Sequence, residues 1–351
     1  MQPRVAPPQV PLEKSRIEDD PGFAAWSAHL IDEQGNGVFL SWGFGLPLCR
    51  LGGPEGPARV APGLSLLVVA QGAPSLWLHQ RFHADDAAWE APAGRWCFGK
   101  SQVEALRDVT SQVVIANLEC ALPGTRARLS GHIEMGGPPR RPAPGGDDDG
   151  LDAGEPDDEW SPLMGPGQGR AILSVGDAHR FHLQGRAYHQ RWGHRGALPE
   201  DALVGFGHLP FADRDISVQL LVDAHGRGRA CGVVTQLDGR CEVVGDLEVE
   251  RTTEPDGLLL KRGSAMWLEL SEQRVMHPRG VEADVLVRGR APLALPVLGS
   301  LSWIDARALR DPEERRWATR FLHVVDERAS LATRRETGPV RGRWRRALSF
   351  R

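Results

Sequence analysis

The sequence predicts a mostly β protein built from two antiparallel β-barrel or β-sandwich halves, with one short helix near its C-terminus. At 351 residues, the chain is longer than one hydrophobic core usually serves. Its 41 glycines and 27 prolines divide it into short apolar runs of strand length. Several runs alternate apolar and polar side chains, which is typical of strands with one face in a core.

The first half of the chain is expected to contain a tail and then a β domain. Residues 1–22 are proline-rich and should be a disordered tail, and residues 23–198 should form the N-terminal domain. Segments that are β-branched or leucine-rich, or that alternate strictly, end at Gly, Pro or Asp in this domain. They predict strands at 38–42, 64–69, 113–118 and 129–135.

Residues 136–160 contain proline, glycine and acidic residues with hardly an apolar side chain. A segment of this composition buries too little apolar surface to order itself. We therefore predict a mobile acidic insertion. A solvated spacer is favoured over an acidic partner-binding loop, because runs of like charge are usually solvated.

Residues 199–351 are expected to form a second domain in the style of the first. Apolar and polar residues alternate at 216–220, and a glycine-rich segment at 223–229 is typical of a hairpin turn. Many short, evenly spaced strands with such turns are typical of barrels and sandwiches. Further strands are predicted at 242–250, 266–270 and 283–288.

One helix is predicted late in the chain, where Asp311 can cap it and Pro312 suits its first turn. Its apolar face would comprise Trp317, Phe321 and Val325. The segment 334–351 mixes arginine with bulky apolar residues. We expect this segment to close the barrel, with contact to an anionic membrane surface as the alternative.

Composition excludes several functional classes. The net charge is only −4 and three lysines accompany many arginines, so no basic face for nucleic acid is expected; the arginine bias suits a GC-rich bacterial genome. Five cysteines without CxxC spacing favour reduced thiols and a cytoplasmic protein. No run is long enough to span a bilayer and the N-terminus lacks a signal-like apolar region, so a lipid-like substrate would require peripheral membrane contact.

The common nucleotide, zinc-protease and hydrolase motifs are missing from the sequence. What stands out is the segment 185–194, which places the single tyrosine, Tyr188, beside His189, Gln190 and Trp192. Polar side chains at this density beside a core strand require partners or a function. Four histidines also lie at 179–194, but their spacing matches no zinc pattern. We expect no metal and no other cofactor.

The chain has 11 tryptophans, and most should be ordinary core residues because indole buries a large area wherever it sits. Some are candidates for lining a cavity, where their flat faces could stack on a polyene or stabilise a carbocation. The tryptophans that we assign to substrate binding are Trp26, Trp42, Trp192 and Trp303.

Several elements together resemble the carotenoid 1,2-hydratase (hydroxyneurosporene synthase) family, from about Trp26 to Glu200. The matching elements are 26–35 (the family's WYxDAxxxDG), 66–81 (its next hairpin), 98–101 (IGxSS), 113–119 (VxIDE), 122–131 (PLPxRLxG) and 185–190 (GxAYxDxN). The resemblance implies two lipocalin-like domains with an apolar pocket, sized for a polyene or lipid, between or within them. Relatives of this fold include cyclases that perform a pericyclic step.

Two departures from the family motifs bear on the chemistry. Gln190 stands where the motif has an aspartate, and His29 replaces the aspartate of the opening strand. Adding water to an isolated alkene needs a strong proton donor, and glutamine cannot act as one. The acid would then have to be His29, His189, Glu119 or Asp305.

The leading expectation is a cofactor-free lyase that adds water to a terminal double bond of an acyclic polyene or isoprenoid. Its catalytic residues would be His29, Tyr188, His189 and Gln190, and its substrate-binding residues would be Trp26, Trp42, Glu119, Trp192, Trp303 and Asp305. Two alternatives stay open. A pericyclase would need only shape and a hydrogen-bond donor, and a non-catalytic lipid binder would explain the missing acids.

Overall fold

The computed structural model describes residues 23–46, 61–73, 75–83, 86–90, 94–122, 127–142, 158–177, 179–194, 203–223, 225–252, 257–276, 282–306, 308, 311, 313 and 322–325. Nearly all of them lie in β-strands, which confirms the mostly β prediction. The tail 1–22 and the segment 334–351 lie outside the described residues.

The first sheet holds most strands of the N-terminal half and has the order β22-β4-β3-β2-β1-β13-β12-β9-β8-β7-β6-β5, with β11 pairing alongside β13. Its strands are β1 (Phe23–Ile31), β2 (Gly37–Phe44), β3 (Pro62–Val69), β4 (Leu76–Phe82), β5 (Ala87–Glu90), β6 (Arg95–Phe98), β7 (Ser101–Arg107), β8 (Gln112–Ala121), β9 (Arg128–Gly137), β11 (Asp158–Pro162), β12 (Gly167–Val175), β13 (His179–His194) and β22 (Leu322–Val325).

The second sheet has the order β10-β17-β16-β15-β14-β21-β20-β19-β18, and a β17–β18 pairing closes it into a barrel. Closure leaves these strands without a free edge. Its strands are β10 (Arg141–Pro142), β14 (Leu203–Pro210), β15 (Arg214–Val222), β16 (Gly228–Gln236), β17 (Arg240–Arg251), β18 (Gly257–Arg262), β19 (Ala265–Val275), β20 (Glu282–Arg290) and β21 (Val297–Asp305).

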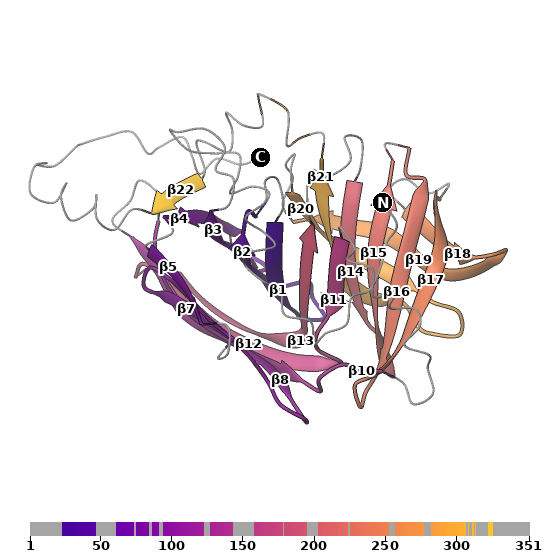
Figure 1. Ribbon diagram of the computed structural model, residues 1–351, viewed down its shortest axis with the longest axis horizontal. Coiled ribbons are helices and arrows are strands. Elements are labelled where there is room, and N and C mark those ends of the chain that lie inside the picture. Colours follow the sequence, from indigo (N-terminus) through magenta and orange to yellow (C-terminus); the bar gives the residue numbers. More distant parts are fainter. Residues whose placement is uncertain are drawn as a thin grey trace, which may run out of the picture.

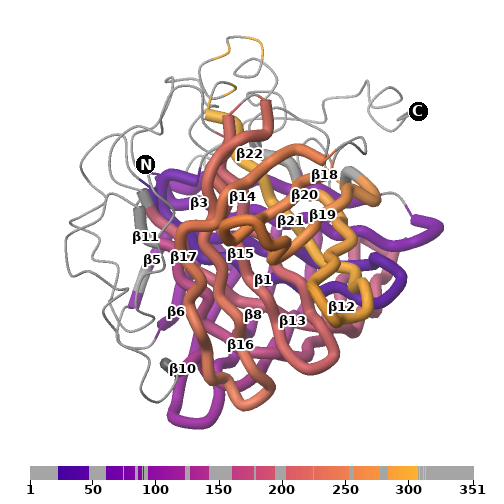
Figure 2. Tube along the Cα trace, turned by 90° about the vertical axis from the view of Figure 1, so that its right-hand side faces the viewer, coloured from indigo at the N-terminus to yellow at the C-terminus, as the bar shows by residue number. Residues whose placement is uncertain are grey.

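The two sheets lie side by side, with β1, β11 and β13 of the first next to β14, β20 and β21 of the second (Figure 1). Figure 2 views the molecule from the side of the second barrel, whose strands cross in front of the first sheet. Two short pairings also join parts that are distant in sequence: β10 runs parallel to β17, and β22 runs parallel to β4.

Strands at the contact between the sheets are buried on both faces. On β1, Ala28 and Leu30 face the core of the first barrel, whereas Phe23 and Ala25 belong to a cluster shared with the second sheet. The period of two that governs a strand explains this division. The alternation predicted at 216–220 is present in β15, but Ser217 is buried instead of solvated.

Two apolar clusters hold the sheets together. One contains Trp160 and Trp192 of the first sheet with Phe206 and Ile304 of the second. The other joins Phe39 and Leu67 to Leu286, Met276 and the half-buried Leu298. Because apolar burial is the main favourable term in packing, these clusters fix the two sheets against each other. The polar residues described below lie between them.

Both ends of the segment predicted to be a mobile acidic insertion, 136–160, lie in strands. Gly136 and Gly137 continue β9, and Arg140 is buried next to β10. Trp160 on β11 is fully buried because its indole packs in the contact between the sheets. Residues 143–157 lie outside the described part of the chain.

The predicted late helix is only partly covered by the structure. The Asp311 carboxylate accepts a hydrogen bond from the Glu313 backbone N–H at 2.8 Å, as a capping residue does. Val325, expected on the helix face, instead lies in β22, whose backbone pairs with the edge strand β4. Trp317 and Phe321 lie outside the described residues. Among the described residues, no helix has the length and apolar character needed to cross a membrane.

Candidate functional site

A layer of buried polar side chains fills the middle of the contact between the two sheets. From the first sheet come Ser27, His29, Tyr188 and Gln190, and each is at most 4% exposed. These residues are paired by register, because Ser27 lies opposite Gln190 and His29 lies opposite Tyr188 on β1 and β13. The second sheet contributes His208, Asp215, Ser217 and Ser300, which are buried to a similar extent. Buried polar groups need hydrogen-bond partners, and most of these have one.

Gln190 connects three neighbours. Its Oε1 accepts hydrogen bonds from Trp160 Nε1 at 2.8 Å and from the Tyr188 hydroxyl at 3.0 Å. Its Nε2 donates to Ser27 Oγ at 3.0 Å. An aspartate at this position could accept from Trp160 and Tyr188 but could not donate to Ser27 in its charged form. The amide is therefore matched to its neighbours.

Tyr188 and His29 reach across to the second sheet. The Tyr188 ring stacks on the His208 ring with centroids 4.2 Å apart, and His29 Nδ1 lies 3.5 Å from Ser300 Oγ. Burial lowers the pKa of His29 to about 3, with smaller contributions from His208 and His189. Burial raises the pKa of Tyr188 above its usual value, and the Ser217 hydroxyl partly offsets this. Both side chains are thus neutral at pH 7.

A charge cluster adjoins the stacked rings. His208 Nε2 donates to Asp215 Oδ2 at 3.0 Å, and Arg186 Nη2 of the first sheet lies 3.5 Å from Asp215 Oδ1. Arg186 also donates to the backbone oxygen of Phe211 at 3.3 Å. Because Asp215 is only 2% exposed, it depends on the His208 ring N–H and the Arg186 guanidinium for the favourable interactions that water would otherwise provide.

A small cavity of about 50 Å³ lies between the sheets beside this polar layer. A water molecule fits in that volume, but a polyene does not. The long apolar pocket implied by the family resemblance is therefore not seen at this place. The cavity is lined by Ser27, His29, Phe39, Ser41, Leu46, Ser65, Leu67, Gln190, Trp192, Phe206, Asp284, Ser302, Trp303 and Ile304.

Asp284 supplies a carboxyl group to the cavity from β20. Burial raises its pKa to about 6, although the Ser302 hydroxyl donates to its Oδ1 at 2.6 Å and favours the charged form. Asp284 and Ser302 are register partners on β20 and β21. A carboxyl group with this pKa is partly protonated near neutral pH and can give up a proton to a bound molecule.

Of the expected catalytic residues, His29 and Gln190 line the cavity. Tyr188 does not line it, but its hydroxyl donates a hydrogen bond to Gln190. His189 is on the opposite face of β13, where its ring stacks on Trp42 with centroids 5.7 Å apart. Burial lowers the pKa of His189 to about 3. In the described part of the chain, neither of its ring nitrogens has a hydrogen-bond partner. It is a core residue of the first barrel.

Of the expected substrate-binding residues, Trp192 and Trp303 line the cavity, and the others lie elsewhere. Trp26 packs against Trp96 on the inner face of the first barrel, with centroids 4.7 Å apart. Trp42 belongs to the same core. Glu119 is on β8, where it pairs with Arg128 at 2.8 Å and its side chain is 44% exposed. Asp305, at the end of β21, does not line the cavity.

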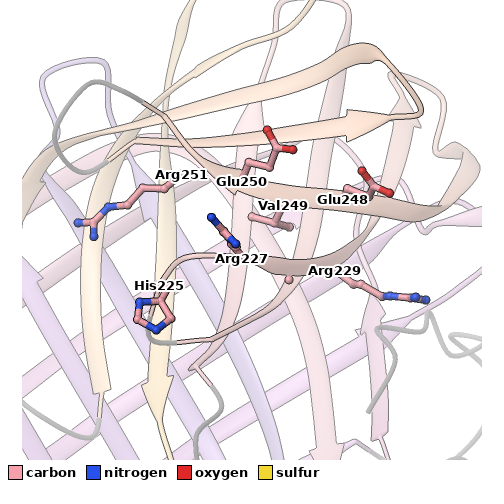
Figure 3. A pocket seen from close by; sticks show the side chains of 8 residues that line it. His225, Arg227, Arg229, Glu248, Val249, Glu250 and Arg251 are labelled. Atoms are coloured by element: carbon pink, nitrogen blue, oxygen red, sulfur yellow. The ribbon is translucent and has the colours of Figure 1, made fainter.

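Two further hollows lie on the second barrel. One, of about 210 Å³, lies inside it. The other is a broad, open hollow of about 1000 Å³ on its outer side, where the charged side chains of Arg229, Arg251 and Glu248 spread apart over the surface (Figure 3). Divergent side chains do not define a site for a small molecule. Within the described ranges, no three His, Cys, Asp or Glu side chains come together in a way that could hold a metal ion.

Sequence reasoning missed Asp284, His208, Asp215 and Ser300. A signal for Asp284 was present, because on the strand predicted at 283–288 it shares a face with the apolar Leu286. An acid on an apolar face is a candidate for burial and an altered pKa. No comparable signal marks His208 or Ser300, since only the packing of the two sheets buries their side chains.

Comparisons with known proteins establish the fold class of the chain. No protein-family model matches the sequence, and no curated protein matches it significantly. Solved structures do match, and together with the strand order they show that the chain consists of two lipocalin-like β-barrel halves. Membership of the carotenoid 1,2-hydratase family is not shown.

Among these structures, a putative AttH from Nitrosomonas europaea has a TM-score of 0.54 at 9% identity, covering 86% of this chain and 98% of its own. CghA with Sch210972 has a TM-score of 0.55 at 11% identity, covering 86% and 94%. Kievitone hydratase from Nectria haematococca superposes less well, with a TM-score of 0.43 at 10% identity and coverage of 88% and 98%. At these identities the likeness shows the fold alone.

Proposed function

We propose that this protein is a cofactor-independent lyase that adds water across a carbon–carbon double bond of an apolar, isoprenoid-like substrate at the cavity between its two halves. The observation that carries the proposal is Asp284, a carboxyl group with a pKa raised to about 6 that faces the cavity between the two halves. Hydration needs an acid of this kind, and of the four acids expected from the sequence only His29 lines the cavity, where burial keeps its ring unprotonated.

Asp284 alone can carry out both proton transfers of the reaction. Its carboxyl group gives a proton to one alkene carbon, which leaves a tertiary carbocation at the other. A water molecule adds to the cation and returns a proton to the Asp284 carboxylate, so that alkene and water become an alcohol. The rings of Phe39, Trp192 and Phe206 at the cavity can stabilise the cation through their π faces.

The neutral groups around the cavity suit this reaction. His29 and Tyr188 are both held uncharged by burial, so neither adds a charge that would compete with the cation. Gln190 and Ser27 place polar atoms at the cavity wall, where they can orient water. Because the cavity has room for little more than a water molecule, the substrate must displace side chains between the sheets when it binds.

A second candidate function is cyclisation of a linear polyene by a pericyclic step. It is favoured by the same array of neutral donors, which can bind a polarised substrate without transferring a proton. CghA, which has the same fold, was crystallised with Sch210972. Such a reaction would not depend on the ionisation of Asp284.

The test is to incubate the protein with lycopene, an acyclic polyene, in water enriched in ¹⁸O and to analyse the extract by mass spectrometry. Hydration predicts an alcohol that carries ¹⁸O, and a rate that falls as the pH rises through about 6 because Asp284 loses its proton. Asp284→Asn should lower the rate about 100-fold or more, whereas the exposed Asp213→Asn should not change it.

Other outcomes separate the alternatives. A cyclised isomer without ¹⁸O, formed equally by wild type and Asp284→Asn, would favour the pericyclase. Unchanged lycopene bound to both proteins would favour a lipid carrier. Either result would contradict the hydratase.

A further inference from the structure

The hairpin between β20 and β21 ends in an exposed apolar tip. Residues 291–298, Ala-Pro-Leu-Ala-Leu-Pro-Val-Leu, contain no polar side chain. Leu293 is fully exposed and Leu295 is 85% exposed, and Pro292 and Pro296 beside them are exposed as well. Neither leucine belongs to an apolar cluster of the described residues. Neighbouring apolar side chains that protrude together from a turn indicate contact with an apolar surface outside the chain.

The backbone conformation of this tip does not suit the leucine that it carries. The Ala294 backbone N–H donates to the Ala291 carbonyl oxygen at 3.2 Å, which closes a β-turn with Pro292 and Leu293 at its centre. Leu293 has a φ of 61° after a proline, which is the pattern of a type II turn. Glycine or asparagine is usual at this position, because a Cβ is unfavourable at positive φ. Local folding therefore does not account for Leu293, whereas contact outside the chain does.

Basic side chains surround the base of the tip. β19 pairs with β20 up to Glu269 and Arg290, so the end of the β18–β19 hairpin beyond this pair lies level with the tip. Glu269 lies 3.9 Å from Arg290, whose side chain remains 66% exposed. It is the only acidic residue in the segments 258–271 and 287–297 of the two hairpins. The basic residues of these segments are Lys261, Arg262, Arg288 and Arg290.

We propose that this tip anchors the protein on a lipid bilayer with anionic headgroups. Leu293 and Leu295 would enter the boundary between headgroups and acyl chains, and the basic side chains behind them would stay at the level of the phosphates. The two prolines restrict the backbone of the tip, so little conformational freedom is lost on insertion. A stable protein partner would need about 800 Å² of surface on each side, and a tip of five residues, 292–296, is too small to offer it.

This proposal goes beyond the proposed reaction and does not depend on it. The tip does not line the reaction cavity. The cavity is bordered by the open end of the same hairpin, where Asp284 and Ser302 are register partners. The anchor would hold that hairpin at the surface of the bilayer, where apolar molecules dissolve.

The test is flotation of the purified full-length chain with lipid vesicles in a density gradient. Vesicles of phosphatidylcholine with about one third phosphatidylserine should carry the protein upward, and vesicles of phosphatidylcholine alone should carry less of it. Arg288→Gln should weaken binding to the anionic vesicles about 5-fold and leave binding to the neutral vesicles unchanged, because the arginine acts through its charge.

Leu293→Gly separates membrane binding from folding. Glycine suits the positive φ of this position, so the variant should unfold at the same temperature as wild type or at a higher one. It should nevertheless bind the anionic vesicles at least about 10-fold more weakly, because one leucine is no longer buried. Leu295→Ser should have a similar effect. The control Val109→Ser changes an exposed residue between β7 and β8 of the first sheet and should bind as wild type does.

The proposal is wrong if the wild type floats with neither kind of vesicle, if a folded Leu293→Gly floats as wild type does, or if Val109→Ser loses binding equally. Analytical ultracentrifugation without lipid tests another occupant. A dimer that Leu293→Gly dissociates would mean that the tip binds a second copy of the chain, which would also overturn the membrane anchor.

Hydration of lycopene in detergent micelles keeps the two proposals distinguishable. Wild type and Leu293→Gly should hydrate it equally, because the tip lies away from the reaction cavity. Absence of hydration with vesicle binding intact would contradict the proposed function only. Hydration without vesicle binding would contradict the membrane anchor only.

Discussion

His189 and Gln190 are neighbours on β13 and both are almost completely buried, yet they meet opposite surroundings. Gln190 faces the second sheet and has three hydrogen bonds, to Trp160, Tyr188 and Ser27. His189 faces the core of the first barrel, stacks on Trp42 and has no hydrogen-bond partner among the described residues. The two faces of β13 are therefore both buried, but one faces a polar layer and the other faces an apolar core.

The difference shows where polar residues act together. Between the sheets, polar groups from both halves pair with one another and surround a cavity. Inside the first barrel, His189 contributes mainly its ring, as an aromatic core residue does. The contact between the sheets should therefore depend on polar pairing, and the barrel core on packing.

The largest effect is expected at the charge cluster. Asp215→Ala would leave the buried His208 without its carboxylate acceptor and would remove the ion pair to the partly exposed Arg186, and should lower the free energy of unfolding by about 3–5 kcal/mol. Urea denaturation measures this loss. Asp213→Ala removes an exposed carboxylate paired with Arg214 and should cost less than about 1 kcal/mol. Equal losses in both variants would mean that the buried cluster is not a stabilising unit.

Gln190→Leu should have the next largest effect. It would leave Trp160 Nε1 and the Tyr188 hydroxyl without their acceptor, and should cost about 2–4 kcal/mol. The control, Gln168→Leu, changes an exposed residue on β12 and should stay within about 0.5 kcal/mol. Chemical denaturation of both variants would decide; a near-neutral Gln190→Leu would show that the bonds to Gln190 are dispensable.

Asp284→Asn should stabilise the protein, with a dependence on pH. Folded Asp284 holds its proton up to about pH 6, whereas the unfolded chain releases it near 3.8. Stability is therefore lost as the pH rises from about 3.8 to 6, and the loss is complete above that range. Asparagine cannot ionise, so the free energy of unfolding of the variant should exceed that of wild type by about 1–3 kcal/mol at pH 8 and by little at pH 4. A gain of equal size at both pH values would contradict the raised pKa.

The smallest effect is expected at His189. His189→Phe keeps an aromatic ring against Trp42 and removes two unpaired nitrogens, so it should change stability by less than about 1 kcal/mol at pH 8. The folded pKa of about 3 lies below the ordinary 6.5, so the contribution of neutral His189 is complete above pH 6.5 and is lost as the pH falls to 3.

Phenylalanine has no ionisable group, so His189→Phe does not lose stability as the pH falls in the way that His189 does. The variant should therefore be more stable than wild type at pH 5, by on the order of 1 kcal/mol. Thermal unfolding at pH 8 and pH 5 provides the comparison. His182→Phe, at an exposed position of the same strand, should show no such dependence; a destabilised His189→Phe at both pH values would mean that the imidazole has a partner.

Part of the site could be predicted from the sequence. The density of polar and aromatic side chains at 185–194 predicts a functional segment, and this segment supplies Gln190 and Trp192 to the cavity. His29 is a candidate only through the family resemblance, because it replaces the aspartate of the opening motif, and the register of β1 and β13 puts it opposite Tyr188. The family resemblance also makes Glu119 a candidate, but its place on β8 leaves it exposed to solvent and paired with Arg128.

The β class, the two halves and the alternation within strands can be predicted from the sequence, because they follow from local turn residues and from the period of two. Which face of each strand meets which neighbour depends on how the two sheets pack. Burial of Asp284 arises when β20 packs against the first sheet, and that packing raises its pKa. Desolvation is a property of the surroundings in space, so residues far apart in sequence must come together before it exists.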